Sequence, residues 1–249
     1  IEGIITTVLA KQYRSSFAYK NGITNAFLCS FYRVATLGSG SGVAAIIYLG
    51  EHGIEYGGGF GLYMIQYALH KISIALFSAI FFVMNWEFMR NWFGDYAGLL
   101  AAGYVLTLVI TLGLFLFCCS NRFHHLICRL LDFANQKFHG KFEIMAEEIK
   151  RQCMMLEDAS NHLMKNKKVT TEVIFLCLLK CCFWYGIPYL LFKGVRFQEN
   201  PALTLAQVLA ITSLSVMLAA VIPSPAGIGS TEFVFTSLFA GIVGTGMAG

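Results

Sequence analysis

Ionisable side chains inside long apolar stretches are the residues of this sequence best placed to do chemistry. They are His70, Lys71, Lys180 and Glu232. A charge at membrane depth is costly, so such residues usually bind a ligand or serve transport. A carboxylate suits an ammonium ligand, and a cationic side chain suits a phosphate.

Glu232 is the strongest of these candidates. It lies two residues after Ser230, in the first turn of a helix that we expect to begin there, where the helix dipole favours a carboxylate. With Ser230 as the cap, the acid of a capping box would stand at position 233, which is Phe233, so a purely structural role fits the spacing badly. The backbone N–H groups of the same helix start suit a phosphate.

The other three residues also have purely structural interpretations. Lys71 or Lys180 can extend to the membrane surface or pair with a carboxylate. A lone histidine such as His70 is more often a hydrogen-bonded core residue than a ligand. The sequence leaves both interpretations open.

The composition identifies the class of protein. Of the 249 residues, 57% are hydrophobic and 13% are charged, against roughly 25% charged in a soluble domain. This excludes a soluble globular protein and a disordered chain, and leaves an all-α, polytopic helical membrane protein. The chain begins without Met and stops soon after an apolar segment, so we expect a fragment. We predict one integral membrane domain over residues 1–249.

Four stretches are apolar over the length of about 20 residues that a helix needs to cross a bilayer core. They are residues 60–84, 96–118, 170–193 and 203–222. Two more apolar stretches, 22–49 and 223–246, are interrupted by glycine or by proline and glycine. Such breaks survive at membrane depth only inside protein or beside a wet cavity, which favours two re-entrant segments and a transporter-type site. Two loops joining ordinary spans are the alternative.

The loop 119–169 holds nine of the 18 lysines and arginines, which places it in the cytoplasm and places residues 85–95 and 194–202 outside. Apolar residues recur in this loop at helical spacing: Leu126, Leu130 and Phe133, then Phe138, Phe142 and Met145. The pattern predicts a cytoplasmic amphipathic helical hairpin, either lying on the inner leaflet or solvated on all sides.

Motifs of soluble enzymes are missing from the sequence. The eight cysteines form no CxxC and the six histidines no HExxH, and there is neither a GxSxG nor a Walker motif. We therefore assign no disulfide, no metal, no cofactor, no catalytic residue and no nucleic acid to this chain.

The second broken segment carries a recognisable pattern. Residues 223–232 read Pro-Ser-Pro-Ala-Gly-Ile-Gly-Ser-Thr-Glu. This resembles the Pro-x-Pro-Gly-Gly-x-Gly-x-x-Glu signature of the lysylphosphatidylglycerol synthase transmembrane-region family, the flippase-like membrane domain of the multiple peptide resistance factor. The resemblance marks as site residues Pro223, Pro225, Gly227, Gly229, Ser230 and Glu232.

The first broken segment resembles the same family more loosely. The matching residues are Thr36, Gly42, Tyr48, Gly53 and Ile54. Leu37 stands where the family has proline, and Val43-Ala44 replaces its Gln/Glu-Pro pair. The resemblance covers essentially the whole chain, although the family's first span is expected to be missing.

The resemblance implies a helical bundle with two re-entrant elements around a lipid-sized cavity in the bacterial plasma membrane. In complete proteins of the family, this domain moves aminoacylated phosphatidylglycerol between leaflets, which gives resistance to cationic antimicrobial peptides. A separate soluble synthase domain makes that lipid from aminoacyl-tRNA, and we expect none among these residues. The expected partners are membrane phospholipid and a synthase domain or protein, and self-association into a homo-oligomer stays open.

The hypothesis for the site is that Glu232 and the turn Gly227–Ser230 hold the lipid headgroup. Arg33, Lys71 and Lys180 are weaker candidates for its phosphate. Three other functions stay open: the membrane part of a phosphatidylglycerol lysyltransferase, a transporter of another amphiphile, and a scaffold without transport.

Overall fold

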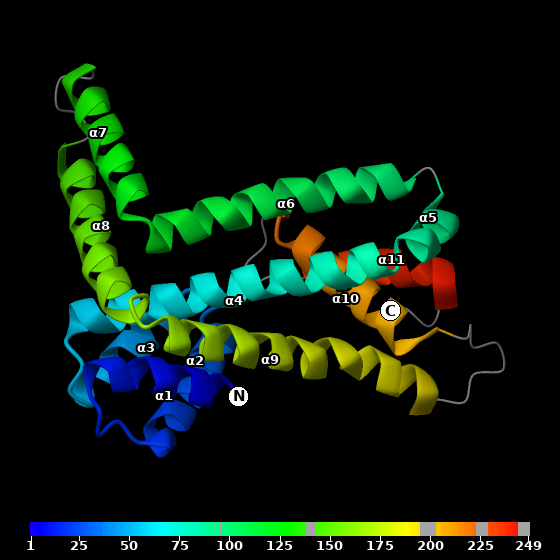
Figure 1. Ribbon diagram of the computed structural model, residues 1–249, viewed down its shortest axis with the longest axis horizontal. Coiled ribbons are helices and arrows are strands. Elements are labelled where there is room, and N and C mark those ends of the chain that lie inside the picture. Colours follow the sequence, from blue (N-terminus) through cyan, green and yellow to red (C-terminus); the bar gives the residue numbers. More distant parts are fainter. Residues whose placement is uncertain (95, 138–142, 195–202, 223–228, 244–249) are drawn as a thin grey trace. The chain divides into compact units, whose positions relative to one another are not determined.

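The computed structural model describes residues 1–94, 96–137, 143–194, 203–222 and 229–243, which fold into helices with no strand among them (Figure 1). This confirms the predicted all-α class. The helices are α1 Glu2–Tyr13, α2 Tyr19–Ala35, α3 Gly40–Glu51, α4 Tyr56–Met84, α5 Trp86–Phe93, α6 Tyr96–Cys119, α7 Asn121–Lys137, α8 Glu143–Leu163, α9 Lys167–Gly194, α10 Leu205–Ala219 and α11 Ser230–Val243.

The chain divides into two compact units, each made of two segments. Unit 1 comprises Ile1–His70 and Leu112–Phe175, and unit 2 comprises Lys71–Thr111 and Leu176–Gly249. The helices α4, α6 and α9 have residues in both units.

Three described helices are long and apolar enough to cross a membrane: α4, α6 and α9. They coincide with three of the four predicted spans. The extracellular loop expected at 85–95 contains a short helix of its own, α5, whose residues run from Trp86 to Phe93. The expectation of a single domain over the whole chain stays a prediction.

The fourth predicted span, residues 203–222, is shorter than expected. Its helix α10 has 15 residues, fewer than the roughly 20 that a span needs. It begins at a capping box, in which the Thr204 hydroxyl accepts the Gln207 N–H and the Gln207 side chain accepts the Thr204 N–H. Ten of its residues are buried, so its apolar character reflects burial in protein rather than contact with lipid.

The core of unit 2 forms around α10. Val208, Ile211 and Leu214 of α10 are fully buried, together with Phe239 of α11. The Tyr104 hydroxyl of α6 donates a hydrogen bond of 2.8 Å to the Ala75 carbonyl of α4. This core fixes the position of α11, which carries Glu232.

In unit 1, α1 and α2 approach each other closely through glycine. A Cβ atom on Gly22 would lie 2.1 Å from the Thr7 hydroxyl oxygen and 2.3 Å from the Gly3 carbonyl oxygen. The first broken segment begins with α2, so this close contact helps to position it.

The predicted helical hairpin in the loop 119–169 is confirmed as α7 and α8. Its two helices are joined by an ion pair between Asp132 and Lys150. The predicted apolar positions Phe138 and Phe142 lie outside the described residues.

Candidate functional site

The first broken segment is a helix–turn–helix, in which α2 ends at Ala35 and α3 begins at Gly40. Leu37 adopts a φ of 50°, in the left-handed region. The Gly38 N–H donates to the Arg33 carbonyl over 2.7 Å, and the Leu37 N–H donates to the Val34 carbonyl over 3.4 Å. These two bonds form a Schellman motif with Leu37 in the place usually held by glycine. Proline, which the resembled family has at this position, cannot adopt this φ and has no N–H to donate to the Val34 carbonyl.

Thr36 connects the two halves of this segment. Its hydroxyl donates to the Tyr32 carbonyl in α2 over 2.6 Å and accepts the Gly40 N–H at the start of α3 over 2.7 Å. Ser39 adds a hydrogen bond from its hydroxyl to the Thr36 carbonyl. The conformation of the break therefore depends on the Thr36 hydroxyl rather than on glycine flexibility alone.

Replacing Thr36 with valine, which has the same shape without the hydroxyl, is expected to lower the free energy of unfolding by about 1 kcal/mol, the usual cost of a lost cap. Thr36→Ser, which keeps the hydroxyl, is the control and should stay within a few tenths of wild type. Thermal unfolding in detergent measures both, and equal stability of the valine variant and wild type would contradict this role.

Gly42 and Ser41 pack against a residue that the sequence did not single out. A Cβ atom on Gly42 would lie 3.0 Å from the Tyr63 ring, and the Ser41 and Tyr63 hydroxyl oxygens lie 3.2 Å apart. Tyr63 belongs to α4, 22 residues further along the chain. No sequence pattern indicates this contact, because it arises from the packing of α3 against α4.

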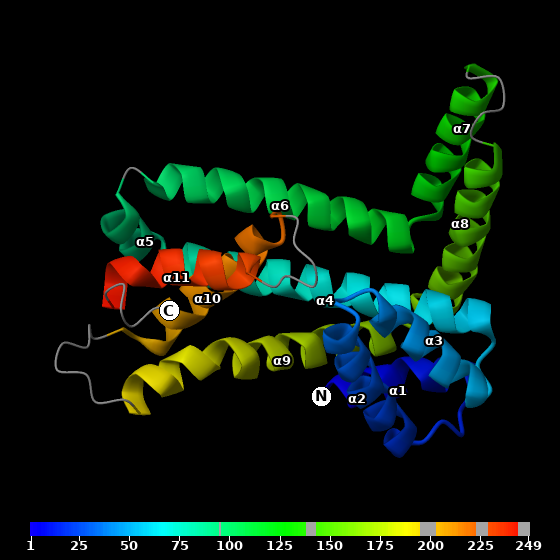
Figure 2. The same ribbon diagram turned by 180° about the vertical axis from the view of Figure 1, so that it is seen from behind.

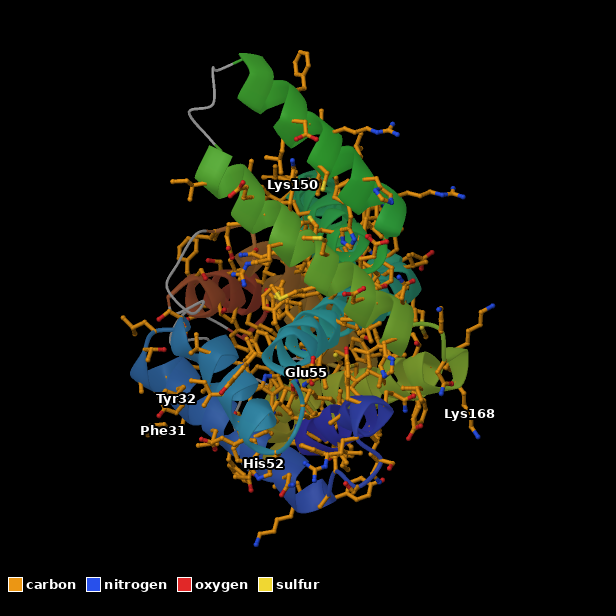
Figure 3. The ribbon with its side chains drawn as sticks, turned by 90° about the vertical axis from the view of Figure 1, so that its left-hand side faces the viewer. Phe31, Tyr32, His52, Glu55, Lys150 and Lys168 are labelled. Carbon is orange, nitrogen blue, oxygen red and sulfur yellow. The ribbon has the colours of Figure 1, made fainter. Side chains whose placement is uncertain are left out.

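Tyr48 contributes to the end of α3. Its ring stacks on His52 with a centroid distance of 4.2 Å, and His52 Nδ1 lies 2.8 Å from the Tyr48 carbonyl oxygen. Arg14 donates to the His52 carbonyl over 2.6 Å. Figure 3 shows His52 and Glu55 at the turn between α3 and α4. In unit 1, Tyr48 therefore helps to hold this turn.

The second broken segment leads into α11, which begins at Ser230. Gly229 occupies the cap position with a φ of 85°, where glycine is favoured. Glu232 Oε2 accepts the Gly229 N–H over 2.7 Å. Pro223, Pro225 and Gly227 lie outside the described residues.

This geometry corrects the interpretation of Glu232 as a residue without a capping role. The cap is Gly229 rather than Ser230, so Glu232 is the third residue of the helix and supplies the acidic half of a capping box. The carboxylate is exposed. It has two oxygens and about four acceptor positions, so the bond to Gly229 fixes its direction without filling its capacity.

The remaining candidates are distributed over the two units. Arg33 is exposed at the end of α2, and His70 is half-buried on α4; both belong to unit 1. Lys71 and Lys180 are half-buried in unit 2, which also contains Glu232.

The structure thus brings Thr36, Gly42 and Tyr48 together on one helical pair and places Gly229, Ser230 and Glu232 at one helix start. The first group lies in unit 1 and the second in unit 2.

Long apolar helices combined with two helices that restart after a glycine-bearing break define a polytopic helical membrane protein. A model of the family described as "Lysylphosphatidylglycerol synthase TM region" matches residues 5–249, and the chain belongs to this family. It is therefore a membrane domain linked to the synthesis or flipping of lysylphosphatidylglycerol. No curated protein and no solved structure matches the chain.

Proposed function

We propose that the chain is a flippase-like domain of the cell membrane that moves lysylphosphatidylglycerol, or a related aminoacylated lipid, between leaflets. The observation that carries the proposal is the Glu232 carboxylate, which Gly229 holds in place at the start of α11. Family membership supports the choice of lipid.

The headgroup of this lipid has one phosphate and two ammonium groups. Glu232 offers a negative charge to an ammonium group, and the first turn of α11 offers backbone N–H groups to the phosphate. Both elements sit on a helix that Val234, Leu238 and Phe239 anchor in the core of unit 2. Lys71 and Lys180, which belong to the same unit as Glu232, are further candidates for contact with the phosphate.

Outward movement of this lipid accounts for resistance to cationic antimicrobial peptides by simple electrostatics. Each lysylated headgroup replaces a net negative charge with a net positive one, so the outer leaflet attracts cationic peptides less. Transport is tested by the share of the lipid that an amine-reactive, membrane-impermeant reagent labels on intact cells, with and without the protein.

A phosphatidylglycerol lysyltransferase is the second candidate, because the family description contains the word synthase. It predicts that the purified chain transfers lysine from charged tRNA to phosphatidylglycerol. We expect no lysyl transfer by the chain alone, because no described residue group resembles an aminoacyl-transfer site. Radiolabelled lysyl-tRNA and phosphatidylglycerol vesicles provide the assay, and formation of labelled lipid would favour the enzyme.

A further inference from the structure

The outer face of α7 combines exposed apolar and basic side chains. Leu126, Leu130 and Phe133 are 51%, 58% and 65% exposed, and Arg122 and Arg129 are exposed as well. At 100° per residue, Arg122, Leu126, Arg129 and Phe133 fall within an arc of about 60°. We call Arg122, Leu126, Arg129, Leu130 and Phe133 the α7 stripe.

The charge of the α7 stripe is positive. Asp132 is the one acid in the sequence of α7, and it pairs with Lys150 of α8, which Figure 3 shows on that helix. The hydrogen bond to Asp132 also raises the pKa of Lys150. On α8, Glu148 pairs with Arg151 over 2.7 Å. The two arginines of the stripe therefore face solvent without a neutralising acid from their own helix.

Within unit 1, the hairpin runs crosswise to the end of α6 that belongs to the same unit, and both ribbon views agree on this (Figures 1 and 2). In both views, α7 lies on the same side of α8 as the end of α6 that belongs to unit 1. Because α6 is a membrane-spanning candidate, a helix crosswise to it runs along a membrane surface. The α7 face turned away from α8 is then the face nearer to lipid.

A polar groove of about 400 Å³ lies at the foot of α7. Two cations, Arg122 and Lys165, line it together with Ser120, Ser160 and Asn161, and no carboxylate is among its lining residues. Arg122 belongs to both the groove and the stripe. Both cations are exposed, so a ligand can reach them.

We propose that the α7 stripe and this groove form a docking surface for a leaflet of anionic phospholipid, in which the groove binds one headgroup phosphate. Leu126, Leu130 and Phe133 lie among the acyl chains, and Arg129 lies at the level of the phosphates. This matches the composition of interfacial helices, which combine an apolar face with arginine and lysine. The surface involves neither Glu232 nor the broken segments, so it can be tested separately from transport.

The test for the groove is native mass spectrometry of the full chain in detergent with phosphatidylglycerol or phosphatidylcholine added. Each basic residue near an anionic surface raises affinity about fivefold, so the Arg122→Gln/Lys165→Gln variant should bind phosphatidylglycerol about 25-fold more weakly. Arg122→Lys should restore most of the affinity lost at that position. Arg90→Gln, the same charge change on α5, should bind like wild type.

Two results would overturn the groove assignment. One is equal binding of phosphatidylglycerol by the double variant and wild type. The other is displacement of the lipid by millimolar inorganic phosphate, which would make the groove a site for soluble anions.

The stripe is tested by a fluorescent amino acid in place of Phe133, with the protein in nanodiscs containing phosphatidylglycerol with brominated acyl chains. We expect the bromines to quench this fluorophore, and Arg122→Gln/Arg129→Gln to reduce the quenching. A fluorophore that brominated chains do not quench would show that α7 does not enter the leaflet.

Discussion

Glu232→Gln is expected to abolish the outward display of lysylphosphatidylglycerol while the protein remains folded. A glutamine oxygen can accept the Gly229 N–H as Glu232 Oε2 does, so the start of α11 keeps its cap. The substitution then removes only the charge. A hydrogen bond to a charged group contributes about 1.5–3 kcal/mol, which corresponds to a loss of about ten- to a hundredfold in the rate of transport.

The matched control is Glu87→Gln. Glu87 is likewise an exposed acid in the first turn of a helix of unit 2, but it lies on α5 rather than at the start of α11. Cells that make the lipid should display it normally with Glu87→Gln and lose the display with Glu232→Gln, at equal protein levels. An unchanged display in the Glu232 variant would leave the carboxylate with its capping role only.

Gly22→Ala is expected to cause a large loss of stability in unit 1. The new Cβ would lie 2.3 Å from the Gly3 carbonyl oxygen, which belongs to the backbone and cannot rotate away. The helices α1 and α2 must separate, and overpacking of this kind costs about 1–3 kcal/mol. Thermal unfolding in detergent should show a clearly lower midpoint.

Gly186→Ala is the control for this prediction, because no atom lies within 4 Å of a Cβ added at Gly186. That variant should be as stable as wild type or more stable by up to about 1 kcal/mol, since alanine favours a helix more than glycine does. A Gly22→Ala protein as stable as Gly186→Ala would contradict the close contact of α1 and α2.

The long apolar helices could be predicted from the sequence because an apolar run of about 20 residues or more is typical of a membrane-spanning helix. The helix α10 shows the limit of that argument, since burial in protein and contact with lipid produce the same composition. Its start at Leu205 is set by a local capping box at Thr204. Similarly, the helical spacing in the loop 119–169 predicted a hairpin, but composition alone could not say which face of α7 is exposed.

The candidate site was predicted in outline and missed in detail. Sequence patterns found Glu232 at a helix start, but a shift of one residue in the cap changed its local role, and helix ends are uncertain by that amount. Leu37 could not be predicted in a left-handed conformation, because residues other than glycine rarely adopt it. Tyr63 was missed because its contact with Gly42 arises only from tertiary packing.

The central claim is that the charge of Glu232 selects an aminoacylated headgroup for transport. It is tested most directly in vesicles containing the purified protein, by comparing the transbilayer rates of lysylphosphatidylglycerol and phosphatidylglycerol. We predict that wild type moves the lysylated lipid at least about tenfold faster, the effect of a free-energy difference near 1.4 kcal/mol, and that Glu232→Gln removes this preference. Equal rates for the two lipids in wild type, or an unchanged preference in Glu232→Gln, would contradict the claim.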